Sequence, residues 1–380
     1  MEIFMTEKNQ EPHAAAFLKK NAVMFTALAA AVVSCFFVPP DGEYINYFDF
    51  KTLSCLFCVL AVVCALKNIN FFYILARKVV RRFKNTRLCI LVLVYITFIG
   101  SMLIANDMAL LTFLPLGYFV LKTTNTEKYM AFTFIMQNIA ANLGGMLTPF
   151  GNPQNLYLYT RFNIPTADFM GIMAAPFILS VSLITLCCLI FIKPENMYIG
   201  DENVSLNSKR TAIYLVLFFL AIVMVFRVVP YTAGLAVILV SLFLADRKAL
   251  AAVDYPLLLT FVFFFVFAGN MSRLESVRNF FEMLLNKNTL IFSVLSCQVI
   301  SNVPSAILLS RFTGNYPALL VGVNIGGVGT LIASLASLIT FREYVKHNPR
   351  RSGYYIKIFS VFNFAFLFIL TGFMSFIQNK

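Results

Sequence analysis

Long apolar runs alternate with short polar breaks along most of the chain. Several of these runs are nearly uncharged and are long enough for a helix to cross a hydrocarbon core of about 30 Å. The pattern predicts an all-α polytopic membrane protein with about nine full spans, within a range of roughly nine to eleven. The predicted apolar segments are 20–38, 48–66, 128–160, 168–192, 211–228, 231–245, 255–270, 316–341 and 355–377, with an interfacial segment at 69–85 and an amphipathic segment at 273–287.

Two further apolar units are interrupted by a polar break. The unit 88–121 is interrupted at Ala-Asn-Asp-Met (105–108), and the unit 288–313 is interrupted at Ser-Asn-Val-Pro-Ser (301–305). If the first unit crossed the membrane, the basic residues on its two flanks would lie on opposite sides, against the positive-inside rule. We therefore predict two re-entrant hairpins at these units.

The segments 128–160 and 316–341 contain residues that stop a helix. The first holds the stretch NLGGMLTPFGNPQN, whose glycines and prolines interrupt a helix at membrane depth. Its pattern Asn-x-Gly-Gly-x-x-Thr, which starts at Asn142, recurs 182 residues later at Asn324. Unpaired backbone groups are tolerated in a membrane only inside protein or against a watery cavity. Both segments are therefore predicted to be broken helices.

Hairpin, broken helix and final span follow in the same order twice. We predict a first repeat over residues 1–193, a cytoplasmic linker over 194–210 and a second repeat over 211–380. The second hairpin then enters from the opposite side, which makes this an inverted-topology repeat. Such repeats with discontinuous helices are a recurrent build of secondary transporters.

Charge supports the same topology. The net charge is +13, yet only 12% of the residues are charged, and the basic clusters lie between apolar segments. The topology places most of them inside, so no nucleic-acid partner is needed to explain the charge. The first apolar run lacks a small-residue cleavage site, so we expect a first span with a cytoplasmic N-terminus. The expected location is the plasma (cytoplasmic) membrane.

Cysteine and histidine give no sign of a metal centre. The eight cysteines lie mostly in apolar segments, where a packing role is the better interpretation, and both histidines lie in predicted loops. We expect no transition-metal site, no Walker-type nucleotide site and no cofactor. No constellation of nucleophile and base indicates an enzyme.

Candidate chemistry gathers at the breaks. Half-helix N-termini suit a carboxylate or oxyanion, while unwound carbonyls suit Na⁺. The alternative is that the glycines serve tight helix packing and the amides cap helix ends. Asp107 stands at a hairpin tip, where a carboxylate is costly and usually marks an ion or proton path, although it could instead cap the second hairpin arm. Arg311, which follows the second hairpin, could attract an anion, although interfacial snorkelling is the better interpretation.

Four motifs together resemble a known group. ANDMALLTFLP, NLGGMLTPFGNPQN, SNVPSAILL and NIGGVGTLIASLASLI resemble paired motifs of the ion transporter superfamily, in particular its citrate-transporter-like and arsenite-permease branches. That group is related to the divalent-anion/sodium symporters, but neither tip preserves their Ser-Asn-Thr. The resemblance implies substrate-binding residues Asn106, Thr148, Asn152, Asn302, Thr330 and Ser334. It implies cation-binding or coupling residues Asn106, Asp107, Gly144, Gly151, Ser301, Asn302 and Gly326.

The predicted function is therefore cation-coupled secondary transport of a small anion by alternating access. The substrate would be an organic di- or tricarboxylate or an oxyanion, and the coupling ion Na⁺ or H⁺. The expected partners are this substrate and the lipid bilayer, and a homodimer is consistent with the resemblance. A nearer alternative is an arsenite/antimonite permease or Na⁺/H⁺ antiporter, in which Asp107 handles the cation. An alternative of another class is an anion channel.

Overall fold

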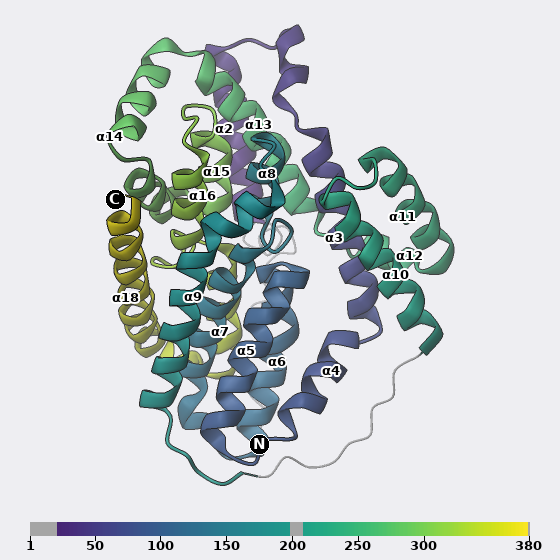
Figure 1. The fold of residues 1–380 in the computed structure, drawn as a ribbon, viewed down its shortest axis with the longest axis vertical. Helices are drawn as coiled ribbons and strands as arrows, with labels where there is room; N and C mark the ends of the chain where they lie inside the picture. The colour runs from purple at the N-terminus through teal and green to yellow at the C-terminus, as the bar shows by residue number, and fades with distance from the viewer. Residues whose placement is uncertain (1–20, 198–207, 379–380) are drawn as a thin grey trace, which may run out of the picture.

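Helices make up nearly all of the fold. A computed structural model describes residues 21–197 and 208–378 (Figure 1). The predicted cytoplasmic N-terminus and the middle of the predicted linker lie outside these described residues. Within them there is no named strand, only an isolated bridge between Asn85 and Asn196. The prediction of an all-α polytopic membrane protein is confirmed.

The first half contains eight α-helices in the described residues. Each predicted segment is recovered within a few residues, and the interfacial segment becomes a short helix. The helices are α2 Ala22–Phe37, α3 Phe50–Asn68, α4 Phe71–Val80, α5 Thr86–Ile104, α6 Asn106–Thr123, α7 Met130–Gly144, α8 Pro153–Arg161 and α9 Thr166–Phe191.

The second half contains nine more in the described residues. They are α10 Ser208–Val225, α11 Tyr231–Ala245, α12 Arg247–Ala251, α13 Tyr255–Arg273, α14 Glu275–Ile300, α15 Asn302–Leu309, α16 Tyr316–Ile325, α17 Leu335–His347 and α18 Ser352–Gln378.

Helix α14 is two helices joined at a kink. Asn288 has the non-helical angles φ −164° and ψ 95°, and its Oδ1 accepts a hydrogen bond from the N–H of Ile291 at 2.9 Å. The residues before the kink carry the amphipathic pattern, and those after it form the first arm of the second hairpin. A side-chain cap at this point restarts the helix in a new direction.

Seven helices of the described chain are long and apolar enough to cross a membrane. They are α3, α5, α9, α10, α13, α14 and α18, while α2, α11 and α16 are shorter apolar helices. Large apolar side chains stand exposed on this outer surface, such as Phe36, Phe219 and Leu244. A bilayer is the environment in which such a surface is stable.

Two helical hairpins, α5–α6 and α14–α15, each joined by a single residue, occupy opposite halves of the molecule (Figure 1). Helices α5 and α6 pack side by side in the lower half, and α14, α15 and α16 lie in the upper half. Helices α9 and α18 run along the flank of this central group, and α10 to α12 stand beside α3 on the other side. The turns of both pairs thereby meet in the middle.

Candidate functional site

Both helix pairs turn through the same unusual backbone conformation. Ala105, between α5 and α6, has φ 64° and ψ 152°, and Ser301, between α14 and α15, has φ 73° and ψ 161°. An asparagine follows each of them and accepts a hydrogen bond from the next N–H, at 3.0 Å for Asn106 and 2.9 Å for Asn302. Such angles are strained for a residue with a side chain, and strained residues concentrate at functional sites.

A helix is interrupted in each half, at 145–152 between α7 and α8 and at 326–334 between α16 and α17. A threonine in each of these breaks forms a hydrogen bond with the helical hairpin of the same half, which is α5–α6 in the first half and α14–α15 in the second. Thr148 Oγ1 donates a hydrogen bond to the carbonyl of Met102 at 2.8 Å, and Thr330 Oγ1 donates to the carbonyl of Gln298 at 3.2 Å. Each carbonyl belongs to the residue three positions before the strained turn. The same bond therefore forms at matching positions of the two motif pairs.

Glycines allow the breaks to approach the hairpins. A Cβ added at Gly144 would lie 2.6 Å from Ser101 Oγ, and one at Gly326 would lie 2.7 Å from Cys297 Cβ. Gly151 packs against a carbonyl of its own break, 2.4 Å from where a Cβ would stand. A side chain at Gly144 or Gly326 would force the hairpin away from the break, and one at Gly151 would distort the break itself.

Buried amides join the two breaks. Asn324 Nδ2 donates to Asn155 Oδ1 at 2.6 Å, and Asn152 Nδ2 donates to Asn324 Oδ1 at 3.3 Å. Nearby, Asn138 Nδ2 donates to Ser337 Oγ at 3.3 Å. All five side chains are at most 1% exposed, so these bonds form where unpaired polar groups are costly. The two halves are thus tied together at the centre of the protein.

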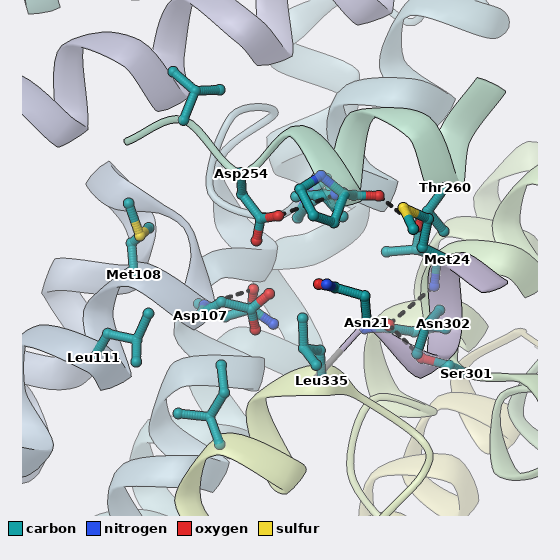
Figure 2. A pocket seen from close by; sticks show the side chains of 18 of the residues that line it. Asn21, Met24, Asp107, Met108, Leu111, Asp254, Thr260, Ser301, Asn302 and Leu335 are labelled. Atoms are coloured by element: carbon teal, nitrogen blue, oxygen red, sulfur yellow. Dashed lines mark hydrogen bonds between the residues drawn. The ribbon is translucent and has the colours of Figure 1, made fainter. Parts of the chain in front are cut away.

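A cavity of about 720 Å³ lies beside the two hairpin tips. Figure 2 shows its walls, which combine both tips with the starts of α2 and α13. The start of α8, the end of α3 and one face of α17 complete the lining. The predicted residues that line it are Asn106, Asp107, Ser301 and Asn302. Its volume lies in the range usual for small-molecule sites.

A sequence profile for citrate transporters matches residues 3–321. The chain belongs to the citrate transporter family. An uncharacterized transporter of Methanocaldococcus jannaschii is 32% identical over 333 residues, 87% of this chain and 91% of that protein. The inner membrane protein YbiR of Escherichia coli is 27% identical over 333 residues, covering 86% and 88%. The silicon efflux transporter LSI3 of Oryza sativa is 27% identical over 192 residues, covering 49% and 39%.

Membership of the citrate transporter family confirms the resemblance drawn from the four motifs. It also confirms the prediction of a membrane transporter rather than an enzyme. The protein is a multi-pass membrane protein.

In this citrate transporter family member, the other predicted site residues do not line the cavity. The hydroxyl groups of Thr148 and Thr330 donate hydrogen bonds to the hairpins. Ser334 Oγ accepts a hydrogen bond from the N–H of Ser337 at 3.3 Å, which caps α17. None of the following is among the lining residues: Thr148, Asn152, Thr330, Ser334, Gly144, Gly151 and Gly326. In this structure these residues hold the breaks in shape, and their direct contact with substrate or cation stays a prediction.

The sequence analysis did not single out several residues of the cavity. Asp254 lines it and caps α13, because its Oδ1 accepts a hydrogen bond from the N–H of Leu257 at 3.1 Å. Gln154 lines it from the start of α8, and Lys67 and Lys346 stand with Arg342 on its wall. Gln154 lies inside the first break motif and could have been found there. Asp254 precedes an apolar run and has the pattern of an ordinary helix cap.

Arg311 serves the fold and lies away from the cavity lining. Its Nη2 donates a hydrogen bond to the carbonyl of Tyr47 at 2.9 Å, which fastens the second hairpin to the loop between α2 and α3. Across residues 21–197 and 208–378, no group of three or more His, Cys, Asp or Glu side chains is placed to hold a metal ion.

Proposed function

We propose that this protein is a cation-coupled secondary active transporter of a small anion, which binds in the cavity between the two hairpin tips. The main observation in support is that both strained hairpin tips, at residues 105–107 and 301–302, and the starts of α8 and α17 line one cavity. Helix N-termini present free N–H groups and a positive dipole end, which favour carboxylate or oxyanion groups. Asn106 and Asn302 add neutral hydrogen-bonding groups that bind an anion without holding it permanently.

The direction in which the cavity extends supports alternating access. Its lining follows α17 from Leu335 to Lys346, a distance of about 16 Å along the helix. Lys346 lies near the basic turn at Arg350 and Arg351, which the charge pattern places in the cytoplasm. We take this conformation to be open to the cytoplasm, in a plasma-membrane protein whose N-terminus is cytoplasmic. The matching Thr148 and Thr330 bonds support an inverted repeat, which is a common basis for alternating access.

A coupling cation follows from the charge inside the cavity. Asp107 lies on the wall where the anion would bind, and its Oδ1 has no hydrogen-bond partner in the described structure. An ionised carboxylate repels a bound anion, so Na⁺ or H⁺ at Asp107 would favour substrate binding. This repulsion is a physical reason for coupled movement of cation and anion.

The second candidate is a permease for a hydroxylated metalloid acid, such as arsenite or antimonite, or a Na⁺/H⁺ antiporter. The same unpartnered Asp107 favours it, because a carboxylate can carry the cation or proton without any anion. The silicon efflux transporter, which resembles half of this chain, gives this alternative further weight. An anion channel would use the same cavity without coupling.

Transport in proteoliposomes separates these functions. Purified protein is reconstituted, and uptake of labelled citrate, succinate, phosphate and arsenite is measured with an inward gradient of Na⁺, of H⁺ or of neither. Saturable anion uptake that requires one gradient supports the proposal, and its loss in Asp107→Asn, with Asp168→Asn at the exposed start of α9 as control, assigns the coupling. Metalloid transport or cation exchange without an anion supports the second candidate. Anion currents independent of either gradient indicate a channel.

A further inference from the structure

Two carboxylates share the cavity, although they are far apart in the sequence. Asp107 belongs to the first hairpin tip, and Asp254 is the residue before α13. Figure 2 shows their side chains on facing walls, with the space of the cavity between them. Like charges so placed in a partly buried site destabilise one another unless a cation or proton lies between them.

Neither carboxylate has a basic partner in the part of the chain that the structure describes. The ion pairs found there involve other acidic residues, namely Asp41, Glu43, Glu195 and Glu343. Asp254 uses Oδ1 to cap α13, while Asp107 Oδ1 is shielded from solvent and accepts no hydrogen bond. Lys67, Arg342 and Lys346 share the cavity wall, but within the described residues none of them forms an ion pair with either carboxylate.

An independent observation points to a ligand here. Gln154, on the same cavity wall, is only 1% exposed, and its Oε1 has no hydrogen-bond partner among the described residues. Its Nε2 donates to Asn324 Oδ1 at 3.4 Å. This orientation is fixed, because Asn324 uses its own amide nitrogen to donate to Asn155 and to Leu320. A buried amide oxygen without a donor is costly unless a ligand satisfies it.

We propose that Asp107, Asp254 and Gln154 Oε1 form a binding site for a small hard cation. Carboxylate and amide oxygens are the ligands that Na⁺ and Mg²⁺ take in proteins. The site deepens the proposed function, on which it rests, since it places the coupling cation between the hairpin tip and the start of α13. It also makes Asp254 a second coupling residue.

Cation binding is tested without any anionic substrate. Thermal unfolding of the purified full-length protein is followed while NaCl or MgCl₂ replaces choline chloride at constant ionic strength and pH. We expect a saturable rise in Tm with one of these cations. Asp254→Asn, Asp107→Asn and Gln154→Leu should each weaken the apparent affinity by roughly tenfold or more. Asp168→Asn should keep the wild-type response.

The Asp254→Asn variant is chosen to keep the fold. Asparagine caps helices as well as aspartate does, so α13 retains its cap while one charge is removed. A wild-type cation response in Asp254→Asn would overturn the site, and so would a Tm that responds to pH but to neither cation. Transport is a separate readout. Cation binding without anion uptake would refute the proposed function and leave the site standing, whereas cation-coupled uptake unchanged in Asp254→Asn would do the reverse.

Discussion

Asn324 and Asn155 are joined by a hydrogen bond of 2.6 Å between residues 169 positions apart. Asn155 also turns its amide nitrogen to three carbonyls of the first break, those of Gly145, Met146 and Thr148, at 3.0 to 3.3 Å. The buried Asn155 side chain thereby satisfies unwound carbonyls of the first half and is bonded to the second half through Asn324. This explains how a break at membrane depth is tolerated.

Removing that side chain should destabilise the protein. Asn155→Ala leaves buried carbonyls and the Asn324 amide without partners, which costs about 1–3 kcal/mol. We expect a clear fall in Tm of the detergent-solubilised protein. Asn279→Ala, on the exposed outer face of α14, should leave Tm unchanged. Equal melting of both variants would show that water replaces the lost bonds.

The second break depends on one glycine. Gly329 has φ +121°, and a Cβ there would lie 2.2 Å from Gln298 Oε1. Gly329→Ala should therefore lower Tm, because both the backbone angle and the space oppose a side chain; the angle alone costs about 1–2 kcal/mol. Gly353→Ala in α18, where nothing lies within 4 Å, should be neutral or slightly stabilising. A neutral Gly329→Ala would mean that this break relaxes freely.

The first hairpin tip stores strain that glycine would relieve. At φ 64° and ψ 152°, Ala105 is in a region that glycine enters without penalty. Ala105→Gly should raise Tm, since strain of this kind costs about 1–3 kcal/mol. Ala109→Gly, four residues later in the buried interior of α6, should lower it. Two changes of the same chemistry thus have opposite expected signs, and a fall for both would refute strain at the tip.

The basic residues of the cavity wall should attract the anion. Lys67→Gln with Lys346→Gln removes two positive charges from the lining, and we expect the apparent KM for a di- or tricarboxylate to rise roughly tenfold at low salt. Added salt should shrink the difference, because these charges are screened. Lys209→Gln, at the exposed start of α10, is the matched control. Initial uptake rates at two ionic strengths check this, and an unchanged KM would exclude electrostatic attraction at the wall.

The sequence predicted the helices and their breaks because these signals are local. Glycines and prolines near Thr148, and the polar break at Asn106, mark the places where a helix stops in the structure. Even the start of the second hairpin at residue 288 coincides with the kink. Such features depend on neighbours a few residues away, and one chain displays them directly.

The sequence could not assign the threonines or Asp254. Whether Thr148 faces the cavity or the hairpin depends on a carbonyl 46 residues earlier, and the structure uses its hydroxyl there. Asp254 has the local pattern of a helix cap, and only the fold brings it opposite Asp107. Residues that act through distant partners need the tertiary arrangement.

The bonds from Asn155 to Asn324 and from Asn138 to Ser337 have a mechanical consequence. Together with the threonine bonds, they fasten hairpins and breaks into one block, while Asp254 begins a helix on the far side of the cavity. A bound cargo would then keep most of its contacts if this block slid as a unit. The cargo's contacts with α13, and with the start of α2 and the end of α3 that share the wall, would have to break and re-form. The cavity would then be the boundary between a moving block and the rest of the protein, and a cation bound between Asp107 and Asp254 would hold the two together.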